Sequence, residues 1–381
     1  MLHLIIDIRS LLPKNNPTGV PEYAKQLLGA MFFCLGQKKR KEPAITLFSS
    51  GREAPDLTFL ASYRKRFTHV HIPVSNRALN ASFKVLSRPT IEGLISRATK
   101  NKLPAQTIFF APNLNLFPLL PRTRLVTTFH DLSYERYPEL LKQKERWWHT
   151  MVSPRAIASR AHAIIAVSQS TKDDLTNLYG IPPKKITVVY SGISPEFQKS
   201  PSPKNRLQTK NYKLKTILYL GNQEGRKNIT CLLAAFALVK KKLPARLVLA
   251  GRPDTSVNFG AKSKGVTQLG VVSERKRLAL YQEADLLVYP SLFEGFGFPP
   301  LEAMACGVPV VASFTSSLPE ATGDAALLAP PRNAATLASA IEEMLTDEPL
   351  RNLFIERGLK RAKQFQWKKT AEETLKVLLS V

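Results

Sequence analysis

The sequence predicts an α/β protein with two doubly wound domains, each built on a parallel sheet. Short apolar or β-branched runs recur along the chain and alternate with segments of helical periodicity. These runs are apolar throughout instead of alternating with polar residues, which is typical of parallel strands buried on both faces. A polar stretch divides the runs into two series. The pattern therefore indicates two α/β domains in succession.

The strands of the first predicted domain are expected at His3–Ile8, Ile45–Phe48, His69–Pro73, Thr107–Ala111, Leu125–Thr128, Ala163–Val167 and Ile186–Tyr190. Those of the second are expected at Thr216–Leu220, Arg246–Ala250, Val266–Leu269, Leu286–Tyr289, Pro309–Ala312 and Ala326–Leu328. Between them, Ser194–Lys215 is rich in Pro, Ser, Lys and Asn, as linkers are. We place the first domain at 1–197, the linker at 198–213 and the second domain at 214–364. Ligands bind such sheets at the carboxyl ends of the strands, so we expect the two domains to face a shared central cleft.

Composition excludes several classes of protein. The chain has 381 residues, 55 of them basic and 29 acidic, for a net charge of +26. No apolar stretch is long enough to span a membrane and no signal peptide is visible, so we expect a cytoplasmic protein. Three scattered cysteines favour neither a disulfide framework nor a zinc site. Basic clusters such as Lys38–Lys41, Arg64–Arg66 and Lys240–Lys242 suit nucleic acid, phosphorylated substrates or an acidic membrane.

The stretch Tyr289–Val311 carries the most chemical information. An expected strand leads into a glycine-containing loop, then a helix at about Leu301–Ala305 whose N-terminus would attract an anion such as phosphate. Glu294 stands in the loop and Glu302 in the helix. A carboxylate accepts paired hydrogen bonds from vicinal hydroxyls, so one glutamate could bind a sugar and the other a ribose. Alternatively, Glu302 interacts only with the helix and Glu294 is a solvated loop acid.

The run EGFGFPPLE, residues 294–302, resembles the signature of the family-4 retaining glycosyltransferases, enzymes of the GT-B fold with two Rossmann-like domains. ADLLVYPS before it and ACGVPVVAS after it fit the same family, and the resemblance is most secure over 214–345. It implies that Glu294 is catalytic and contacts the sugar of a nucleotide diphosphate donor. It also implies substrate-binding roles for Gly295, Phe296, Gly297, Leu301 and Glu302.

A second motif, YLGNQEGRKN at Tyr219–Asn228, follows the first expected strand of the second domain. Gly221 starts the turn, and Arg226 and Lys227 lie where a diphosphate would be neutralised as it leaves. The resemblance assigns these two cations that catalytic role. Gly225 replaces the proline commoner in the family. The alternative is that both are ordinary surface cations.

The first domain carries weaker signals. Gly19, in NPTGVPEY, lies in a loop that lines the substrate site in the family, although Glu22 reverses the charge expected there. His130 ends an expected strand and could hydrogen-bond a sugar hydroxyl or transfer a proton, with the adjacent carboxylate of Asp131 orienting it. TTFHDLSYERYPE resembles the His-Asp element of mannosyltransferase-like members, which implies that His130 is catalytic. Asp131 either binds substrate or caps a helix.

Together these motifs imply retaining transfer of a hexose to a hydroxyl of a glycan or polyprenyl-linked acceptor, in cell-surface polysaccharide or glycolipid synthesis. The donor would be GDP-mannose or a UDP-hexose. No Asp-x-Asp occurs, so neither a metal nor another cofactor is implied. Lys38–Lys41 is a predicted peripheral contact with an anionic membrane. The closing segment, about 365–381, resembles the family's final helix, which packs back on the first domain.

Two other functions compete with this interpretation. One is a different GT-B enzyme, such as a sugar-nucleotide epimerase or a phosphorylase, but the motifs of neither are visible. The other is a nucleic-acid-binding protein that uses the net charge of +26. Its only faint motif is Arg146–His149 on an expected helix, where we expect the tryptophans to be buried, and we therefore expect no nucleic-acid partner.

Overall fold

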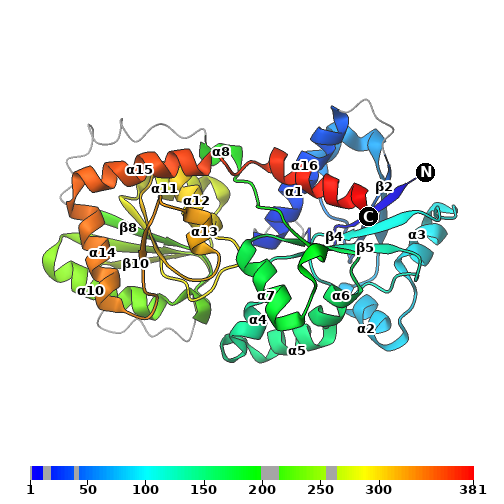
Figure 1. Ribbon diagram of the computed structural model, residues 1–381, viewed down its shortest axis with the longest axis horizontal. Coiled ribbons are helices and arrows are strands. Elements are labelled where there is room, and N and C mark those ends of the chain that lie inside the picture. Colours follow the sequence, from blue (N-terminus) through cyan, green and yellow to red (C-terminus); the bar gives the residue numbers. More distant parts are fainter. Residues whose placement is uncertain (1, 12–18, 38–42, 199–213, 255–263) are drawn as a thin grey trace. The chain divides into compact units, whose positions relative to one another are not determined.

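The computed structural model describes residues 2–11, 19–37, 43–198, 214–254 and 264–381 (Figure 1). The chain divides into two compact units. Unit 1 comprises Met1–Tyr134, Lys142–Gly192 and Trp367–Val381. Unit 2 comprises Glu135–Leu141 and Ile193–Gln366. Each unit contains one fully parallel sheet, which confirms the predicted fold class.

The seven strands of the unit 1 sheet follow the order β3-β2-β1-β4-β5-β6-β7. Their bounds are β1 His3–Asp7, β2 Ala44–Ser50, β3 Thr68–Ile72, β4 Thr107–Ala111, β5 Arg124–Phe129, β6 Ala163–Ala166 and β7 Ile186–Val188. The strand order reverses direction between β1 and β4, which is the point where ligands bind in doubly wound sheets. Strands β1 and β4 are buried at every position because helices cover the sheet.

The helices of unit 1 connect these strands. The α-helices are α1 Gly19–Gly36, α2 Asn76–Leu86, α3 Ile91–Thr99, α5 Gln143–Val152, α6 Pro154–Arg160, α7 Gln169–Tyr179 and the last helix of the chain, α16 Trp367–Ser380. Short 3-10 helices lie at η1 Thr58–Arg66 and η3 Pro183–Lys185. Helix α16 packs beside α1, drawn in red and blue in Figure 1, and the ring of Trp367 meets Tyr23 edge-on at 5.7 Å. The end of the chain thus completes the unit in which it begins.

The six strands of the unit 2 sheet follow the order β10-β9-β8-β11-β12-β13. Their bounds are β8 Lys215–Leu220, β9 Ala245–Ala250, β10 Val266–Gly270, β11 Leu286–Tyr289, β12 Val310–Ser313 and β13 Leu327–Ala329. The helical elements are η2 Pro138–Leu140, α8 Pro195–Gln198, η4 Gly225–Lys227, α10 Ile229–Lys242, α11 Glu274–Glu283, α12 Phe298–Ala305, α13 Leu318–Thr322, α14 Ala334–Thr346 and α15 Glu348–Ala362. Helix α4 Ser133–Arg136 spans the boundary at Tyr134 between the two units.

The structure adds detail that the sequence analysis lacks. The short segment Glu135–Leu141 belongs to unit 2, and unit 2 resumes at Ile193, a few residues before the predicted boundary at 197. Residues 199–213 of the predicted linker and the cluster Lys38–Lys41 lie outside the described residues. None of the described helices is long and apolar enough to cross a membrane.

One expectation about packing is wrong. The run Arg146–His149 does lie on a helix, α5, but Trp147 is 65% exposed instead of buried. Its neighbour His149 turns the other way and stacks on the ring of Tyr134 at 4.0 Å. The helical periodicity therefore places one of the two tryptophans on the surface.

Candidate active site

The strand order of unit 2 brings the two motifs together. Strands β8 and β11 are parallel neighbours, paired through Leu286 with Ile217 and Leu287 with Leu218. The loop after β8 contains Gly221, Arg226 and Lys227, and the loop after β11 contains Glu294. Both loops therefore leave the sheet at the same edge, where its strand order reverses.

Glu294 is the centre of this cluster. Its side chain accepts a hydrogen bond from Lys227 Nζ to Oε1 at 2.6 Å and another from Arg226 Nη1 to Oε2 at 3.3 Å. Glu294 is 6% exposed and Lys227 is 7% exposed, so their ion pair is buried. The structure thus joins three residues that the sequence analysis predicts to be catalytic, although they lie 67 and 68 positions apart.

The electrostatics keep Glu294 ionised. Burial by itself would raise the pKa of its carboxyl, but the charges of Lys227 and Arg226 outweigh burial and lower the pKa to about 2. Burial lowers the pKa of the Lys227 ammonium, whereas the carboxylate opposes that shift. A permanently charged carboxylate accepts hydrogen bonds and donates none, which suits binding to hydroxyl groups. The interpretation of Glu294 as a solvated loop acid is wrong, because the side chain is buried and paired.

The two loops are fixed to each other by further hydrogen bonds. The Leu292 amide donates to the Arg226 carbonyl at 2.8 Å, and Arg226 Nη1 donates to the Phe293 carbonyl at 3.2 Å. On the other side, the Glu294 amide donates to Ser316 Oγ at 2.8 Å, and Ser317 Oγ donates to the Glu294 carbonyl at 2.9 Å. The backbone that carries the carboxylate is therefore held on both sides, so the geometry is preorganised.

Two buried tyrosines, Tyr289 and Tyr219, lie next to this cluster. Tyr289 Oη lies 3.1 Å from Lys227 Nζ and accepts its hydrogen bond, and the ammonium also lies 5.4 Å from the Tyr289 ring centre. Tyr219 stacks on Tyr289 at 5.9 Å. Burial raises the pKa of both phenols well above its ordinary value, so both stay neutral. Both stand in the runs YLGNQEGRKN and ADLLVYPS, but these contacts were not predicted from the sequence.

Glu302 has different partners. It is 5% exposed, accepts a hydrogen bond from Tyr281 Oη at 2.8 Å, and lies 3.6 Å from Arg277 Nη1. Both partners belong to α11, and neither stands in a recognisable motif. The sequence interpretation of Glu302 as a residue that interacts only with its own helix is therefore incomplete, because α11 fixes the carboxylate from outside.

The helix after the glycine loop begins earlier than expected. α12 starts at Phe298 instead of about Leu301, so Pro299 and Pro300 fall in its first turn. Prolines have no N–H, and the Leu301 amide already donates to the Gly297 carbonyl at 3.5 Å. The N-terminus therefore offers fewer free amides to an anion than the predicted start at Leu301 implies.

The remaining motif residues of unit 2 are structural in their visible contacts. The ring of Phe296 is 4% exposed and packs edge-on against Phe298 at 5.3 Å and Phe365 at 5.7 Å. Gly295 is buried in the same loop. Gly221 directly follows β8, and its amide donates to the Ala250 carbonyl at 2.9 Å.

The other predicted residues lie in unit 1. His130 follows β5, and its Nε2 lies 2.9 Å from the Pro112 carbonyl, which can only accept, so Nε2 carries the proton. Burial lowers the pKa of His130, despite opposing effects of the Pro112 carbonyl and Asp131. The neutral ring therefore presents Nδ1 as an acceptor. The Pro112 carbonyl, and not Asp131 as predicted, makes the orienting hydrogen bond to this ring.

Asp131 and Gly19 are less engaged. Asp131 Oδ1 accepts hydrogen bonds from the amide of Ser133 at 2.9 Å and from its hydroxyl at 2.7 Å, which fits the capping alternative for that oxygen. Gly19 is the exposed first residue of α1, and a Cβ there would meet nothing within 4 Å. No group of three or more His, Cys, Asp or Glu side chains within the described ranges could hold a metal ion.

The segment Glu135–Leu141 covers part of this site, which sequence reasoning missed. The hydroxyl of Tyr137 donates to the Leu292 carbonyl at 3.5 Å, and its ring lies 5.9 Å from that of Phe293. Leu140 lies 3.4 Å from where a Cβ of Gly225 would be. Residues 135–139 belong to the run TTFHDLSYERYPE, and their place in that run was the signal that the sequence offered.

Comparisons with known proteins identify the family of this chain. The family described as Glycosyl transferases group 1 matches residues 203–361, and the one described as Glycosyltransferase Family 4 matches residues 46–197. The chain is 34% identical over 284 residues to the O-antigen chain mannosyltransferase B of Escherichia coli, covering 70% of this chain and 73% of that protein. It is 31% identical over 227 residues to the serotype-specific mannosyltransferase WbdA of Escherichia coli, covering 56% of this chain but only 28% of the longer relative.

A solved structure extends the likeness over the full chain. The Anabaena protein Alr3699/HepE in complex with UDP-glucose superposes with a TM-score of 0.66 at 17% identity, covering 100% of both chains. Identity this low supports the fold alone, whereas the mannosyltransferase B match supports the family. The chain is therefore a glycosyltransferase that belongs to family 4, the group 1 glycosyl transferases of mannosyltransferase type with a GT-B fold.

Proposed function

We propose that this glycosyltransferase moves a hexose from a nucleotide diphosphate sugar to a hydroxyl of a glycan or polyprenyl-linked acceptor, with retention of the anomeric configuration. The observation that carries the proposal is the buried Glu294 carboxylate held by Lys227 and Arg226 at the switch point of the unit 2 sheet. One acceptor of hydroxyl hydrogen bonds and two cations meet there. A sugar joined to a diphosphate carries the complementary groups.

In the proposed reaction, the bond between the sugar C1 and the diphosphate oxygen breaks, and its electron pair stays on the diphosphate. The acceptor oxygen forms the new bond to C1 on the same face, and its proton passes to the departing phosphate oxygen. Arg226 and Lys227 stabilise the charge that builds on the diphosphate. Glu294 is already occupied by two cations, so we assign it to the donor sugar hydroxyls and not to attack on C1.

Two further residues receive substrate roles in this proposal. Glu302, fixed by Tyr281 and Arg277, has a defined orientation in which it can accept hydrogen bonds from the ribose hydroxyls. His130 keeps Nδ1 as an acceptor for a hydroxyl of the transferred sugar, because Nε2 is engaged by Pro112. Neither role requires a proton transfer.

The donor we propose is GDP-mannose, because two mannosyltransferases are among the chain's relatives. The Anabaena structure contains UDP-glucose, so a UDP-hexose is the alternative. The same relatives' names favour a role in the synthesis of an O-antigen-like surface polysaccharide. Thermal shift measurements with GDP-mannose, UDP-glucose and UDP-N-acetylglucosamine distinguish these donors, since a ligand stabilises the fold it binds. If only a UDP-sugar raises the melting temperature, the donor in the proposal becomes that UDP-sugar instead of GDP-mannose.

The proposed chemistry uses no metal. Arg226 and Lys227 provide the positive charge that a divalent cation supplies in other transferases. Transfer in excess chelator should therefore proceed at the rate measured without it. Complete loss of transfer in chelator, restored by added Mg²⁺ or Mn²⁺, would show that the proposed metal-free mechanism is wrong.

The decisive variant is Glu294→Gln, which keeps the shape of the side chain and removes its charge. We expect transfer from the donor to fall at least ~100-fold, because electrostatic contacts to the reacting group contribute on this scale. Glu343→Gln, an exposed glutamate of α14 in the same unit, is the matched control and should keep full activity. Wild-type transfer in Glu294→Gln would refute the assignment. The anomeric coupling constant of the product, measured by NMR, tests retention independently.

We also propose that unit 1 contacts an anionic membrane. Phe33, near the end of α1, is 44% exposed, and its neighbour Phe32 stacks on Tyr63 of η1 at 5.9 Å. Arg66 Nη1 lies 3.4 Å from where a Cβ of Gly36 would be. The basic end of η1, Arg64–Arg66, therefore lies beside the end of α1, from which the chain continues to Lys38–Lys41.

Sedimentation with liposomes tests this contact. At low salt, the protein should bind liposomes that contain phosphatidylglycerol and not liposomes of phosphatidylcholine alone. Lys65→Glu should weaken that binding, whereas the exposed Lys184→Glu in the same unit should not. Equal sedimentation of both variants with the wild type would remove this surface from the proposal.

A further inference from the structure

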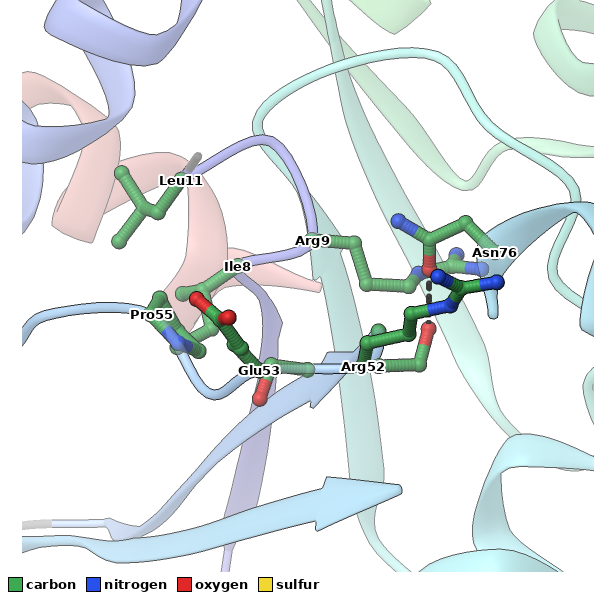
Figure 2. A pocket seen from close by; sticks show the side chains of 10 residues that line it. Ile8, Arg9, Leu11, Arg52, Glu53, Pro55 and Asn76 are labelled. Atoms are coloured by element: carbon green, nitrogen blue, oxygen red, sulfur yellow. Dashed lines mark hydrogen bonds between the residues drawn. The ribbon is translucent and has the colours of Figure 1, made fainter. Parts of the chain in front are cut away.

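Unit 1 contains a cavity of about 310 Å³ at the carboxyl edge of its sheet (Figure 2). Three segments line it: the residues after β1, the end of β2 with the loop that follows, and the first residue of α2. None of its lining residues was singled out by the sequence motifs. Its volume is at the lower end of the range for small-ligand sites, enough for about one sugar unit.

One side of the cavity carries hydrogen-bond donors. Arg9, Arg52 and Asn76 all line the cavity, and in Figure 2 their side chains lie on the side away from Leu11 and Pro55. Ser50 Oγ donates to Asn76 Oδ1 at 2.5 Å, so the amide nitrogen of Asn76 is the group left to donate. All three side chains can therefore donate to a ligand at the same place.

The two arginines differ in how they are held. Arg9 is 5% exposed; its Nε and Nη2 bind Asp7, and Nη2 also donates to the Leu116 carbonyl at 2.9 Å. Its guanidinium is thus fixed and neutralised by Asp7, while Nη1 has no hydrogen-bond partner in the described part of the chain. Arg52 is exposed and forms no ion pair with any described residue. The charge that a ligand could neutralise is therefore that of Arg52.

The other side of the cavity differs in chemistry. Ile8, Leu11 and Pro55 form an apolar wall, and the Glu53 carboxylate lies on that side in Figure 2, away from the Arg52 guanidinium. Glu53 therefore does not occupy the donor side. A ligand that fits has an anionic group at one end and an apolar ring face at the other, and sugars that carry a phosphate or a carboxylate have this form.

We infer that this cavity binds an anionic sugar, with its phosphate or carboxylate on Arg52, Arg9 Nη1 and Asn76 and its ring on the apolar wall. Arginine recognises both anions through paired N–H groups, so the two share one binding chemistry. The identification of this sugar as part of the acceptor rests on the proposed function. The binding itself does not.

Isothermal titration with glucose 6-phosphate, glucuronate and neutral glucose tests the inference. We expect the full-length protein to bind at least one of the two anionic sugars and to bind glucose at least ~10-fold more weakly. Binding of one anionic sugar alone identifies the anion as phosphate or carboxylate, and binding of both indicates a site for either. Binding of neither above the level of glucose overturns the inference.

Variants locate the binding. Arg52→Gln and Asn76→Ala should each weaken binding of the anionic sugar at least ~10-fold, whereas Arg77→Gln, an exposed neighbour outside the cavity lining, should leave it unchanged. Equal affinity in Arg52→Gln and Arg77→Gln would contradict the assignment.

A last pair of measurements separates this inference from the proposed function. Binding of the anionic sugar should persist in Glu294→Gln and in the presence of saturating GDP. If transfer from nucleotide sugars is absent but the anionic sugar still binds through Arg52, only the proposed function fails. If transfer is present and Arg52→Gln changes neither binding nor the KM for an anionic acceptor, only this inference fails.

Discussion

The two units have similar parallel sheets, and each has a buried ion pair at the carboxyl edge of its sheet. The two pairs differ in what they connect. In unit 1, Arg9 and Asp7 form a buried pair at 2.6 Å beside the point where the strand order reverses. In unit 2, Lys227 and Glu294 form a buried pair at the same distance and at the corresponding place. The unit 1 pair joins residues two positions apart, whereas the unit 2 pair joins two loops.

In our proposals, the unit 1 pair therefore lies beside a binding cavity, whereas the unit 2 pair itself contacts the substrate. The local pair between Asp7 and Arg9 fixes the end of β1 and leaves an adjacent cavity open. The long-range pair holds the loops after β8 and β11 together, and in the proposed function its two charges contact the donor. A doubly wound sheet provides the edge in both cases, and the sequence separation of the charges decides what that edge can bind.

The largest effect should come from removing one partner of each pair. Lys227→Met and Arg9→Met each leave a buried carboxylate without its cation, which typically costs about 3–5 kcal/mol. We expect both to destabilise their own unit in denaturant titration, but only Lys227→Met to abolish nucleotide-sugar binding. Lys241→Met, on the exposed end of α10, is the control.

If Lys227→Met does not fold, the double variant with Glu294→Leu removes the buried charge and should recover part of the stability but not nucleotide-sugar binding. If a folded Lys227→Met variant still binds the nucleotide sugar, the claim that only the unit 2 pair contacts the donor is wrong.

A pair of glycine substitutions compares the rigidity of the two regions. Gly251, after β9 in unit 2, has φ +131°, and a Cβ there would lie 2.0 Å from the Gly221 carbonyl oxygen. Gly180, after α7 in unit 1, has φ +70° but nothing within 4 Å of its Cβ position. We expect Gly251→Ala to cost more than about 3 kcal/mol and Gly180→Ala about 1 kcal/mol, because only the first adds a backbone collision to the conformational strain. Similar losses in chemical denaturation would contradict this prediction.

Acid should weaken unit 2 through Glu294. Its pKa is about 2 in the folded chain against 4.5 for an unperturbed glutamate, so the unfolded state takes up a proton first as the pH falls. The stabilisation is complete above about pH 4.5 and is lost towards pH 2, a change of about 3 kcal/mol. We expect this loss in the wild type and not in Glu294→Gln, measured by denaturant unfolding at several pH values. Parallel pH profiles of the two proteins would refute the assignment of the shift to Glu294.

The smallest effect should be that of Arg52→Gln on stability. Its side chain is exposed and has no ion pair with the described residues, so the free energy of unfolding should change by less than about 0.5 kcal/mol. A larger loss would mean that Arg52 is structural, and the contrast with the buried Arg9 would disappear. Thermal unfolding of Arg52→Gln and Arg9→Met, measured under the same conditions, tests this prediction.

Much of unit 2 could be predicted from the sequence, because its candidate site residues lie in contiguous motifs. YLGNQEGRKN and EGFGFPPLE identified Arg226, Lys227 and Glu294, and apolar runs located the strands. The partners that complete the site could not be predicted. Tyr281 and Arg277 stand outside the motifs, and the contact of Tyr289 with Lys227 depends on which strands become neighbours.

In unit 1, less of the candidate site could be predicted from the sequence. His130 was visible in a motif, but its orienting partner, the Pro112 carbonyl, is a backbone atom that any residue supplies. The cavity draws its lining from three separate segments, and Arg9, Arg52 and Asn76 are ordinary residues in the sequence. Only the parallel pairing of β1 with β2 brings them together.

The sequence by itself determined the α/β class, because buried parallel strands and helices have different hydrophobic periods that are local properties of the chain. It also placed the candidate residues Arg226, Lys227 and Glu294 within two short runs of unit 2. Only the tertiary structure decided that Glu294 is an ionised, doubly paired carboxylate and that unit 1 has a cavity lined by Arg9, Arg52 and Asn76. The pKa of Glu294 depends on two cations that lie about 3 Å from its carboxylate but are distant in the sequence. The order of strands in the sheet brings these residues together.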